Sequence, residues 1–199
     1  MKKLFALLAC TIMLSACNEA KNETQKVETD ESFNKVKTTG VFVLGLDDSF
    51  PPMGFRDKEN NIIGFDIDLA KEVCARLGIE LKTQPISWDA KEQELNTGKI
   101  DCIWNGMSVD SARAKAMNLS DPYLKNRMIF TVKDKALANL ESLKGKKIAV
   151  QNGSTAQKLL DASEAGKAAK EIVPFDDNQT ALMDLEKGGV DAVFLDEIV

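Results

Sequence analysis

Strand-like and helix-like segments alternate along the chain after about residue 38, and this alternation limits the possible folds more than any other feature. Residues 41–47 and 79–86 are predicted to be strands, and residues 65–77 repeat apolar side chains at helical spacing until Gly78. The predicted apolar face of this helix consists of Phe65, Leu69, Val73 and Leu77. Alternation of this kind is typical of α/β proteins with mostly parallel sheets.

The first set of segments continues to about residue 132. It contains a short helix that Asp89 caps and that ends near Gly98, a strand at 100–104, a helix that Asp110 caps, and a strand at 128–132.

A second set follows a charged turn at 144–147. Its predicted elements are, in order, a strand at 148–151, a helix at 154–165 ended by Gly166, a strand at 171–175, a helix at 178–187 and a strand at 190–195. Two such sets predict two lobes, at 38–131 and 132–199. Ligands bind at the carboxyl ends of the strands in such sheets, so we expect a site in the cleft between the lobes.

The first residues have the features of an export signal. Two lysines precede a short apolar stretch, and Leu14-Ser15-Ala16-Cys17 is a lipobox, whose cysteine thiol takes a lipid. We expect a signal peptide at 1–16, a lipid anchor on Cys17 that holds the protein at the outer face of the membrane, and a polar, flexible tether over 17–37. The alternative is a cleaved secretory peptide with an incidental cysteine.

Composition argues against several classes of function. The formal net charge is −5 and basic runs are absent from the sequence, which argues against nucleic-acid binding. The chain has no histidine, so the commonest general base is missing, and we expect no catalytic residue, no metal and no other cofactor. Cys74 and Cys102 are expected to be buried free thiols, with a disulfide as the alternative.

Several polar side chains occur where a free amino acid could be held. Arg113 offers a planar fork for a carboxylate, with the hydroxyl of Ser108 close in sequence. Ser154 and Thr155 follow Gly153 at the start of a helix, where unpaired N–H groups favour an anion, although helix capping would also explain them.

Two carboxylates and two aromatic rings complete this set. Asp47 and Asp196 each follow an apolar strand, so we expect them at strand ends beside the cleft, where the alternative is a merely solvated carboxylate. Phe50 and Trp88 could form apolar walls that also attract a cationic group, or could belong to the core.

The motifs resemble those of a known family. They are Asp47, Ser49, Phe50 and Pro51, then Gly64-Phe65-Asp66-Ile67-Asp68-Leu69-Ala70, then Trp104-Asn105-Gly106-Met107-Ser108 with Arg113. Together they resemble the bacterial extracellular solute-binding proteins, family 3, in the branch that binds polar amino acids. The resemblance implies an α/β, two-lobed fold like that of the type II periplasmic binding proteins, in which each lobe is a mostly parallel sheet flanked by helices.

The resemblance also implies roles for individual residues. The residue matching Arg113 binds the α-carboxylate, and Asp196 matches the aspartate that binds the α-ammonium group. The other matches are further carboxylate contacts (Ser154, Thr155), a contact to polar or basic ligand side chains (Asp47), walls (Phe50, Trp88), and contacts to backbone or side-chain groups (Asn105, Gly106, Gln151).

The remaining motif residues are expected to be structural. Phe65 would pack beneath the sheet, while Asp66 and Asp68 would favour the positive end of the helix. Met107 and Trp104 are expected to pack in the core.

The resemblance implies a monomeric, lipid-anchored receptor that captures a polar amino acid by hinge closure and passes it to the membrane permease of an ABC importer. Glutamine, cystine and basic amino acids stay open as ligands. The alternatives are a periplasmic dehydratase of the cyclohexadienyl dehydratase type on the same fold, and a ligand-binding sensor domain. Relatives continue beyond the residue matching Val199 and return to the first lobe, so we expect the second lobe to be incomplete and the chain to be a fragment.

Overall fold

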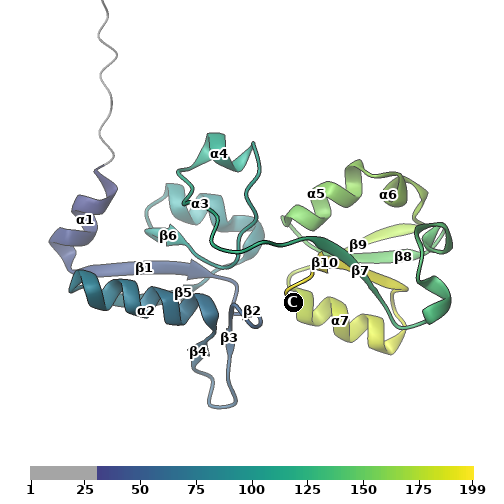
Figure 1. Ribbon diagram of the computed structural model, residues 1–199, viewed down its shortest axis with the longest axis horizontal. Helices are drawn as coiled ribbons and strands as arrows, with labels where there is room; N and C mark the ends of the chain where they lie inside the picture. The colour runs from purple at the N-terminus through teal and green to yellow at the C-terminus, as the bar shows by residue number, and fades with distance from the viewer. Residues whose placement is uncertain (1–30) are drawn as a thin grey trace, which may run out of the picture. The chain divides into compact units, whose positions relative to one another are not determined.

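The computed structural model describes residues 31–199. The predicted signal peptide, Cys17 and most of the predicted tether lie outside these described residues. The strands of the described part form sheets with the orders β5-β1-β6, β7-β10-β8-β9 and β2-β3-β4. The element order alternates strand and helix, as the sequence predicts (Figure 1).

The first sheet is parallel. Its central strand, β1 (Val41–Leu46), pairs with β5 (Glu80–Pro85) on one side and with β6 (Cys102–Ile103) on the other. The helix α2 (Phe65–Leu77) packs against β1 through a core of Leu44, Leu46, Ile67 and Ala70. Both the bounds of α2 and its end at Gly78, which has a left-handed backbone, agree with the prediction.

The predicted apolar face of α2 is wrong. Phe65, Val73 and Leu77 are exposed, at 43%, 40% and 51%, so Phe65 does not pack beneath the sheet. The buried stripe is instead Asp66, Ile67, Ala70 and Cys74. Both stripes have helical spacing, and the one with the small side chains of Ala70 and Cys74 lets the helix lie close to the sheet.

A small antiparallel sheet that the sequence reasoning missed precedes α2. It consists of β2 (Ser49–Phe50), β3 (Gly54–Arg56) and β4 (Ile62–Ile63). Gly64 then leads into α2 with φ +133, and a Cβ there would lie 2.4 Å from the carbonyl oxygen of Met53. A glycine is therefore required where the chain turns from this sheet into the helix.

The second sheet mixes parallel and antiparallel pairs. β10 (Ala192–Asp196) and β9 (Glu171–Phe175) run parallel to β8 (Lys147–Gln151), while β7 (Met128–Val132) runs antiparallel to β10. Ala149, Val193 and Leu195 pack against α7 (Asn178–Lys187). Ile148, Val150 and Ala192 pack on the opposite face with Leu160 of α5 (Thr155–Ala162), and Figure 1 shows the two helices on opposite sides. Burial on both faces explains why consecutive residues in β8 and β10 are apolar.

The helix predicted at 154–165 is two helices. α5 ends at Ala162, and α6 (Glu164–Ala168) runs through Gly166 instead of stopping there. The hydroxyl of Ser163 donates to the carbonyl of Leu160 and accepts from the N–H of Gly166, so this serine ends one helix and caps the next.

The remaining helices are short. They are η1 (Trp88–Ala90), α3 (Lys91–Asn96), α4 (Arg113–Ala116), η2 (Lys135–Leu137) and η3 (Leu140–Leu143). Asp89 lies inside η1 and is not its cap, since Ser87 holds that position. Asp110 accepts from the N–H groups of Ala112 and Arg113 in the turn that precedes α4, but the N-cap position of α4 is Ala112 and not Asp110 as predicted.

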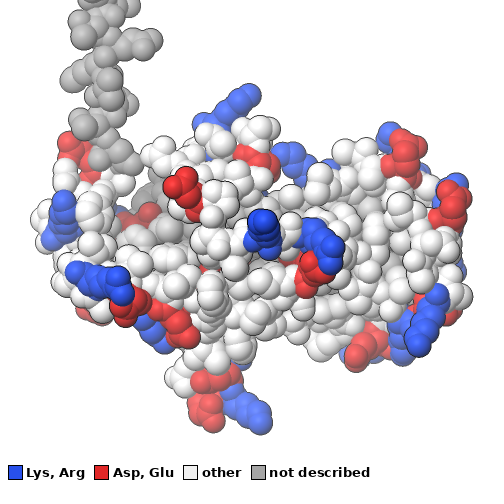
Figure 2. Space-filling view, viewed as in Figure 1, with Lys and Arg blue, Asp and Glu red and all other residues white. Residues whose placement is uncertain are grey.

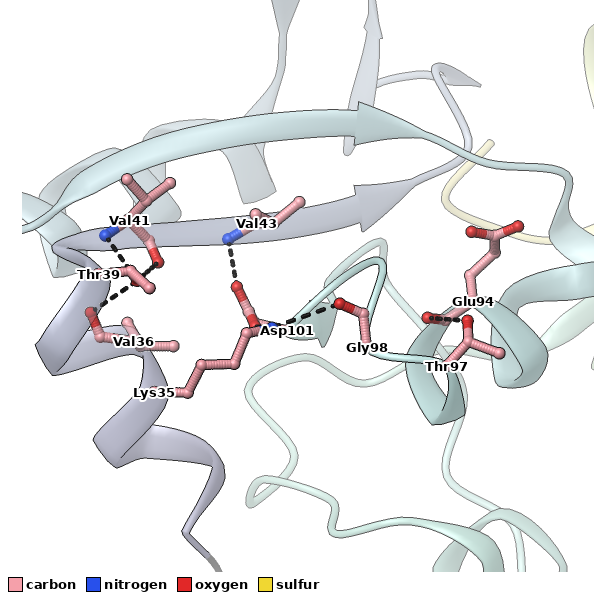
Figure 3. Close-up of polar contacts among 9 residues, drawn as sticks. All are labelled: Lys35, Val36, Thr39, Val41, Val43, Glu94, Thr97, Gly98 and Asp101. Carbon is pink, nitrogen blue, oxygen red and sulfur yellow. Dashed lines mark hydrogen bonds and ion pairs between the residues drawn. The ribbon is translucent and has the colours of Figure 1, made fainter.

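The predicted tether extends too far along the chain, because α1 (Ser32–Thr39) is a helix. Val36 is only 3% exposed. Figure 3 shows Lys35 reaching from α1 to Asp101 and Gly98, where its ammonium lies 2.8 Å from the Asp101 carboxylate. The other oxygen of Asp101 accepts from the N–H of Val43 at 2.9 Å, so the carboxylate links α1 to β1.

Acidic and basic side chains are interspersed on the face shown in Figure 2. Pairs such as Arg76 with Glu72 and Lys167 with Glu164 are exposed, and exposed pairs contribute little stability. Among residues 31–199, every helix is too short or too polar to cross a membrane.

Replacing Asp101 should destabilise the protein more than replacing Lys35. Asp101→Ala leaves the partly buried N–H of Val43 without its acceptor, which should lower the free energy of unfolding by about 1–3 kcal/mol. Lys35→Ala removes an exposed pair and should lower it by less than about 1 kcal/mol. Urea unfolding of both variants measures the difference. Equal losses would contradict the link between Asp101 and β1.

Candidate functional site

The carboxyl ends of strands from both main sheets meet around one small cavity. Asp196 is the last residue of β10, Gln151 is the last residue of β8, and Asn105 follows β6 closely. The cavity is lined by Phe50, Trp88, Asn105, Gly106, Met107, Ser108, Arg113, Gln151, Ser154, Thr155 and Asp196. Every predicted ligand-binding residue except Asp47 is in this lining, and Asp47 is hydrogen-bonded to the lining residue Gln151. Met107, which was not predicted to bind the ligand, also lines the cavity.

The cavity is much smaller than an amino acid. Its volume is about 20 Å³, enough for roughly one water molecule. Phe50 and Trp88 are 5% and 7% exposed, so both rings are packed against their surroundings. The surrounding residues must separate before a larger molecule can enter.

Arg113 is buried and joins the two sheet regions. Its Nη1 donates to the carbonyl of Ser108 at 2.8 Å and to the hydroxyl of Thr155 at 2.9 Å. Ser154 caps α5 by accepting from the N–H of Gln157. The capping role considered for Ser154 is thus present, while Thr155 lies against the cation.

Asp47 and Gln151 form a second direct link between the regions. The Nε2 of Gln151 donates to a carboxylate oxygen of Asp47 at 2.6 Å, and the other oxygen accepts from the N–H of Ser49. The backbone N–H of Asp47 donates to Asn105. Burial raises the pKa of Asp47, and these hydrogen bonds offset part of the rise.

Asp196 lies at the end of its strand, as predicted, with Asn126 donating to its carboxylate. Burial raises the pKa of Asp196, while the bond from Asn126 and the positive charge of Arg113 partly counteract this rise. A cation brought into the cavity would lower this pKa, because it would favour the ionised carboxylate.

Gly106 lets the backbone pass close to the aromatic wall. Its φ is +58, and a Cβ there would lie 3.4 Å from both Phe50 and Met53. An alanine would find ordinary van der Waals contacts there but would have to adopt a left-handed backbone.

A buried carboxylate supports the segment that carries Asn105 and Gly106. Asp66, expected at the positive end of α2, is in its first turn, is 0% exposed and accepts from the hydroxyl of Tyr123 at 2.8 Å. Burial raises the pKa of Asp66, whereas the bond from Tyr123 and the nearby Gly106 N–H and Trp104 indole lower it. Asp66 Oδ2 and Trp104 Nε1 are both buried without a hydrogen-bond partner of normal geometry.

Sequence reasoning missed three residues that position the site: Lys91, Tyr123 and Asn126. A lysine at a helix start and an asparagine in a loop usually face solvent. Nothing in the residue type or sequence position of Lys91 and Asn126 therefore indicated a role in the site. Tyr123 is the one tyrosine of the chain, and its neighbour Pro122 marks a turn, but its partner Asp66 is 57 residues away.

A larger hollow lies beside the same 104–108 segment, with a volume of about 510 Å³. Its lining is mainly apolar and includes Phe42, Leu95 and Ile198, but neither Arg113 nor Asp196. The charged residues of its lining are Lys125 and Asp101, and Asp101 already pairs with Lys35. The small cavity, which both Arg113 and Asp196 line, is therefore the better candidate. Within residues 31–199, no group of His, Cys, Asp and Glu is arranged to hold a metal. Cys74 and Cys102 are free thiols, although Cys102 is only partly buried.

Comparison with known proteins gives a family match. Residues 42–194 match the model of the bacterial extracellular solute-binding proteins, family 3. The chain is 32% identical over 156 residues to the ABC transporter arginine-binding protein 1 of Escherichia coli K12, covering 78% of this chain and 63% of that protein. It is 29% identical over 168 residues to the L-cystine-binding protein TcyJ of the same strain, covering 83% of this chain and 62% of that protein.

A solved structure shows the same architecture. The histidine-bound substrate-binding protein of an ABC uptake transporter from Streptococcus pneumoniae superposes with a TM-score of 0.79 at 33% identity, covering 85% of this chain and 71% of that one. The predicted α/β periplasmic-binding-protein fold is thereby confirmed. Each of these relatives is described as a binding protein. The chain spans 62% of the length of TcyJ and 63% of the length of the arginine-binding protein 1.

The buried carboxyl of Asp66 should make stability depend on pH. Because its pKa is raised above the ordinary value of 3.8, the folded state binds the proton more tightly than the unfolded state. The stability advantage of the wild type over Asp66→Asn should therefore be largest at low pH and should be lost as the pH rises through the raised pKa. The loss in the free energy of unfolding is about 1.4 kcal/mol for each unit by which the pKa is raised.

Urea unfolding between about pH 4 and pH 7 measures this difference in stability. Asp68→Asn, which removes an exposed carboxylate from the same helix, is the matched control. A stability difference that stays flat or grows with pH would contradict a raised pKa for Asp66.

Proposed function

Because the chain belongs to the bacterial extracellular solute-binding proteins of family 3, we propose that it captures a free polar amino acid and delivers it to the membrane permease of an ABC importer. The observation that carries the proposal is the cavity in which Arg113 and Asp196, of opposite charge, line one enclosed space. The named relatives support the ligand class, since they are described as binding arginine or cystine, or as histidine-bound.

The α-carboxylate of the ligand is assigned to Arg113. The carbonyl of Ser108, on the same lobe, orients its guanidinium before a ligand arrives, and the hydroxyl of Thr155 joins it on closure. Ser154 and Thr155, at the start of α5, add hydroxyl and N–H donors, which favour an anion. Ser108, Asn105 and Gly106 are assigned to further polar contacts with the ligand.

The α-ammonium group is assigned to Asp196. This carboxylate is partly buried and has Asn126 and Arg113 nearby. A ligand ammonium would supply a positive charge that stabilises the buried carboxylate in its ionised form. Such charge pairing is strong where water is excluded.

The ligand side chain is assigned to Asp47, Gln151, Phe50 and Trp88, and we propose that it is cationic. Asp47 is 7% exposed and has no cationic partner among its hydrogen bonds in the described chain. A guanidinium or ammonium group would replace the neutral donor Gln151 and pair with the carboxylate, while the rings supply contact area and cation–π attraction.

Capture occurs by hinge closure between lobes at 38–131 and 132–199. Arg113, Asp47 and Trp88 come from the first lobe, and Gln151, Thr155 and Asp196 come from the second. A ligand that contacts both lobes binds the closed state more tightly than the open state and therefore shifts the protein toward closure. The protein acts as a monomer and is not an enzyme, so we assign no catalytic residue and no cofactor.

We place this receptor outside the cytoplasmic membrane. A signal peptide at 1–16 directs export, and acylation of Cys17 anchors the protein. The tether after Cys17 ends at α1, so it is shorter than the span 17–37 expected from the sequence. Its polar composition supports reach toward the permease.

Titration of the full chain with the twenty amino acids and cystine by calorimetry tests the proposal. We expect binding of arginine, lysine or histidine with a Kd in the micromolar range, about −8 kcal/mol. Asp196→Asn should weaken the affinity for every amino acid that binds by about 100-fold, since it leaves the buried ammonium group of the ligand without its anion. Heat from none of the ligands would refute amino-acid capture.

The side-chain assignment has its own test. Asp47→Asn keeps the size of the residue but removes its charge, so it should weaken arginine binding by about 100-fold and change glutamine binding by less than about tenfold. Asp48→Asn, which alters an exposed ion pair with Arg56, serves as the control. An equal loss of affinity for arginine and glutamine would contradict a cationic side-chain site.

A further inference from the structure

We propose that Lys91 is a positioning residue that latches the closed state from outside the ligand cavity, an inference that rests on the proposed capture of an amino acid by closure. The closure latch consists of the Lys91 ammonium, the carbonyls of Trp88 and Gly153, and the pair Asp89 and Asn152. Of these five residues only Trp88 lines the cavity.

Lys91 is buried in an unusual way for a lysine. It is 4% exposed, although it begins the short helix α3. Its ammonium donates to the carbonyl of Trp88 at 2.9 Å and to the carbonyl of Gly153 at 2.9 Å, and it lies 5.0 Å from the centre of the Trp88 ring. One cation therefore joins a wall residue of the cavity to the turn between β8 and α5, 62 positions away in the chain.

The backbone of that turn lies directly against η1. Gly153 has φ +66, and a Cβ there would lie 2.7 Å from the Cα of Asp89. Asn152 donates to the carboxylate of Asp89 at 3.3 Å. Only a glycine permits this close approach, and any opening between the two regions would separate these groups.

The contact favours closure because its acceptors would be left unpaired without Lys91. Burial is the largest effect on the lysine and lowers its pKa, as does nearby Arg113, while Glu92, Asp89 and Asp110 raise it. Replacing the ammonium by an apolar group leaves the Gly153 and Trp88 carbonyls without this donor in the closed state. The bond to Trp88 lies within the first lobe, whereas the bond to Gly153 joins the two lobes. In the open state the Gly153 carbonyl can bond water, so the loss of this second bond falls on closure.

The latch also positions the carboxylate site. Gly153 is followed directly by Ser154 and Thr155, and Thr155 accepts from Arg113. Holding the Gly153 carbonyl at η1 therefore keeps the first turn of α5 beside the guanidinium. The latch should act on the lifetime of the bound state and should leave the encounter with the ligand unaffected, because the ligand meets the open protein.

Stopped-flow binding of arginine to the full chain tests this expectation. Lys91→Met should speed dissociation by about tenfold and change the association rate by less than about twofold. Lys91→Arg, which keeps the charge and donors, should restore most of the slow dissociation. Lys99→Met is the control, because Lys99 follows the same helix but pairs only with Glu94 of that helix.

A glycine pair gives an independent test. Gly153→Ala should speed dissociation, because the added methyl group would collide with Asp89 in the closed state. Gly145→Ala is the matched control, since Gly145 has φ +68 but nothing within 4 Å of its Cβ position. Both changes place an alanine in a left-handed conformation, so only the contact with Asp89 separates them.

Hydrogen exchange without ligand separates the latch from the proposed function. Lys91→Met and Gly153→Ala should raise amide exchange in residues 151–156 relative to their controls. If the wild type fails to bind arginine but these exchange rates rise, the cationic-ligand proposal fails and the contact remains. Unchanged exchange and unchanged dissociation in both variants would overturn the latch.

Discussion

The buried guanidinium of Arg113 is the interaction on which the site depends. It bonds to the carbonyl of Ser108 and to the hydroxyl of Thr155, which are far apart in the chain. A buried cation is tolerated only with acceptors and nearby negative charge, and Asp110 and Asp196 contribute that charge. The fold must therefore bring the segment after β6, the start of α5 and the end of β10 to one place.

The space between these elements is closed by contacts of the protein with itself. Asp47, which lies outside the cavity lining, bonds to Gln151, and Lys91 bonds to Gly153. The remaining volume is about 20 Å³, so ligand entry and the breaking of contacts between the sheet regions have to occur together. Affinity then depends on residues that hold the closed arrangement as well as on residues that touch the ligand.

Much of the fold follows from the local sequence pattern, and the errors of the sequence-based prediction also have local causes. The bounds of α2 and α7 agree with the predicted ranges because a glycine follows each helix. The bounds of β7 and β9 agree because each is a short, mainly apolar run with charged residues on both sides. The apolar face of α2 was misassigned because two stripes of the helix have the same spacing. The meander before α2 was missed because its strands are only two or three residues long. α1 lies partly within the predicted tether because only Val36 of this helix is buried, so the sequence shows no apolar periodicity there.

The sequence by itself determined the alternation of strands and helices and the chemical types near the site: two carboxylates at strand ends, two aromatic rings, and a guanidinium on a helix. These depend on composition and spacing within short segments. Only the tertiary structure decided that Asp66 is buried against Tyr123 and that the ammonium of Lys91 meets Gly153. Those outcomes depend on contacts between residues 57 and 62 positions apart, and neither composition nor periodicity specifies which distant group will satisfy a buried charge.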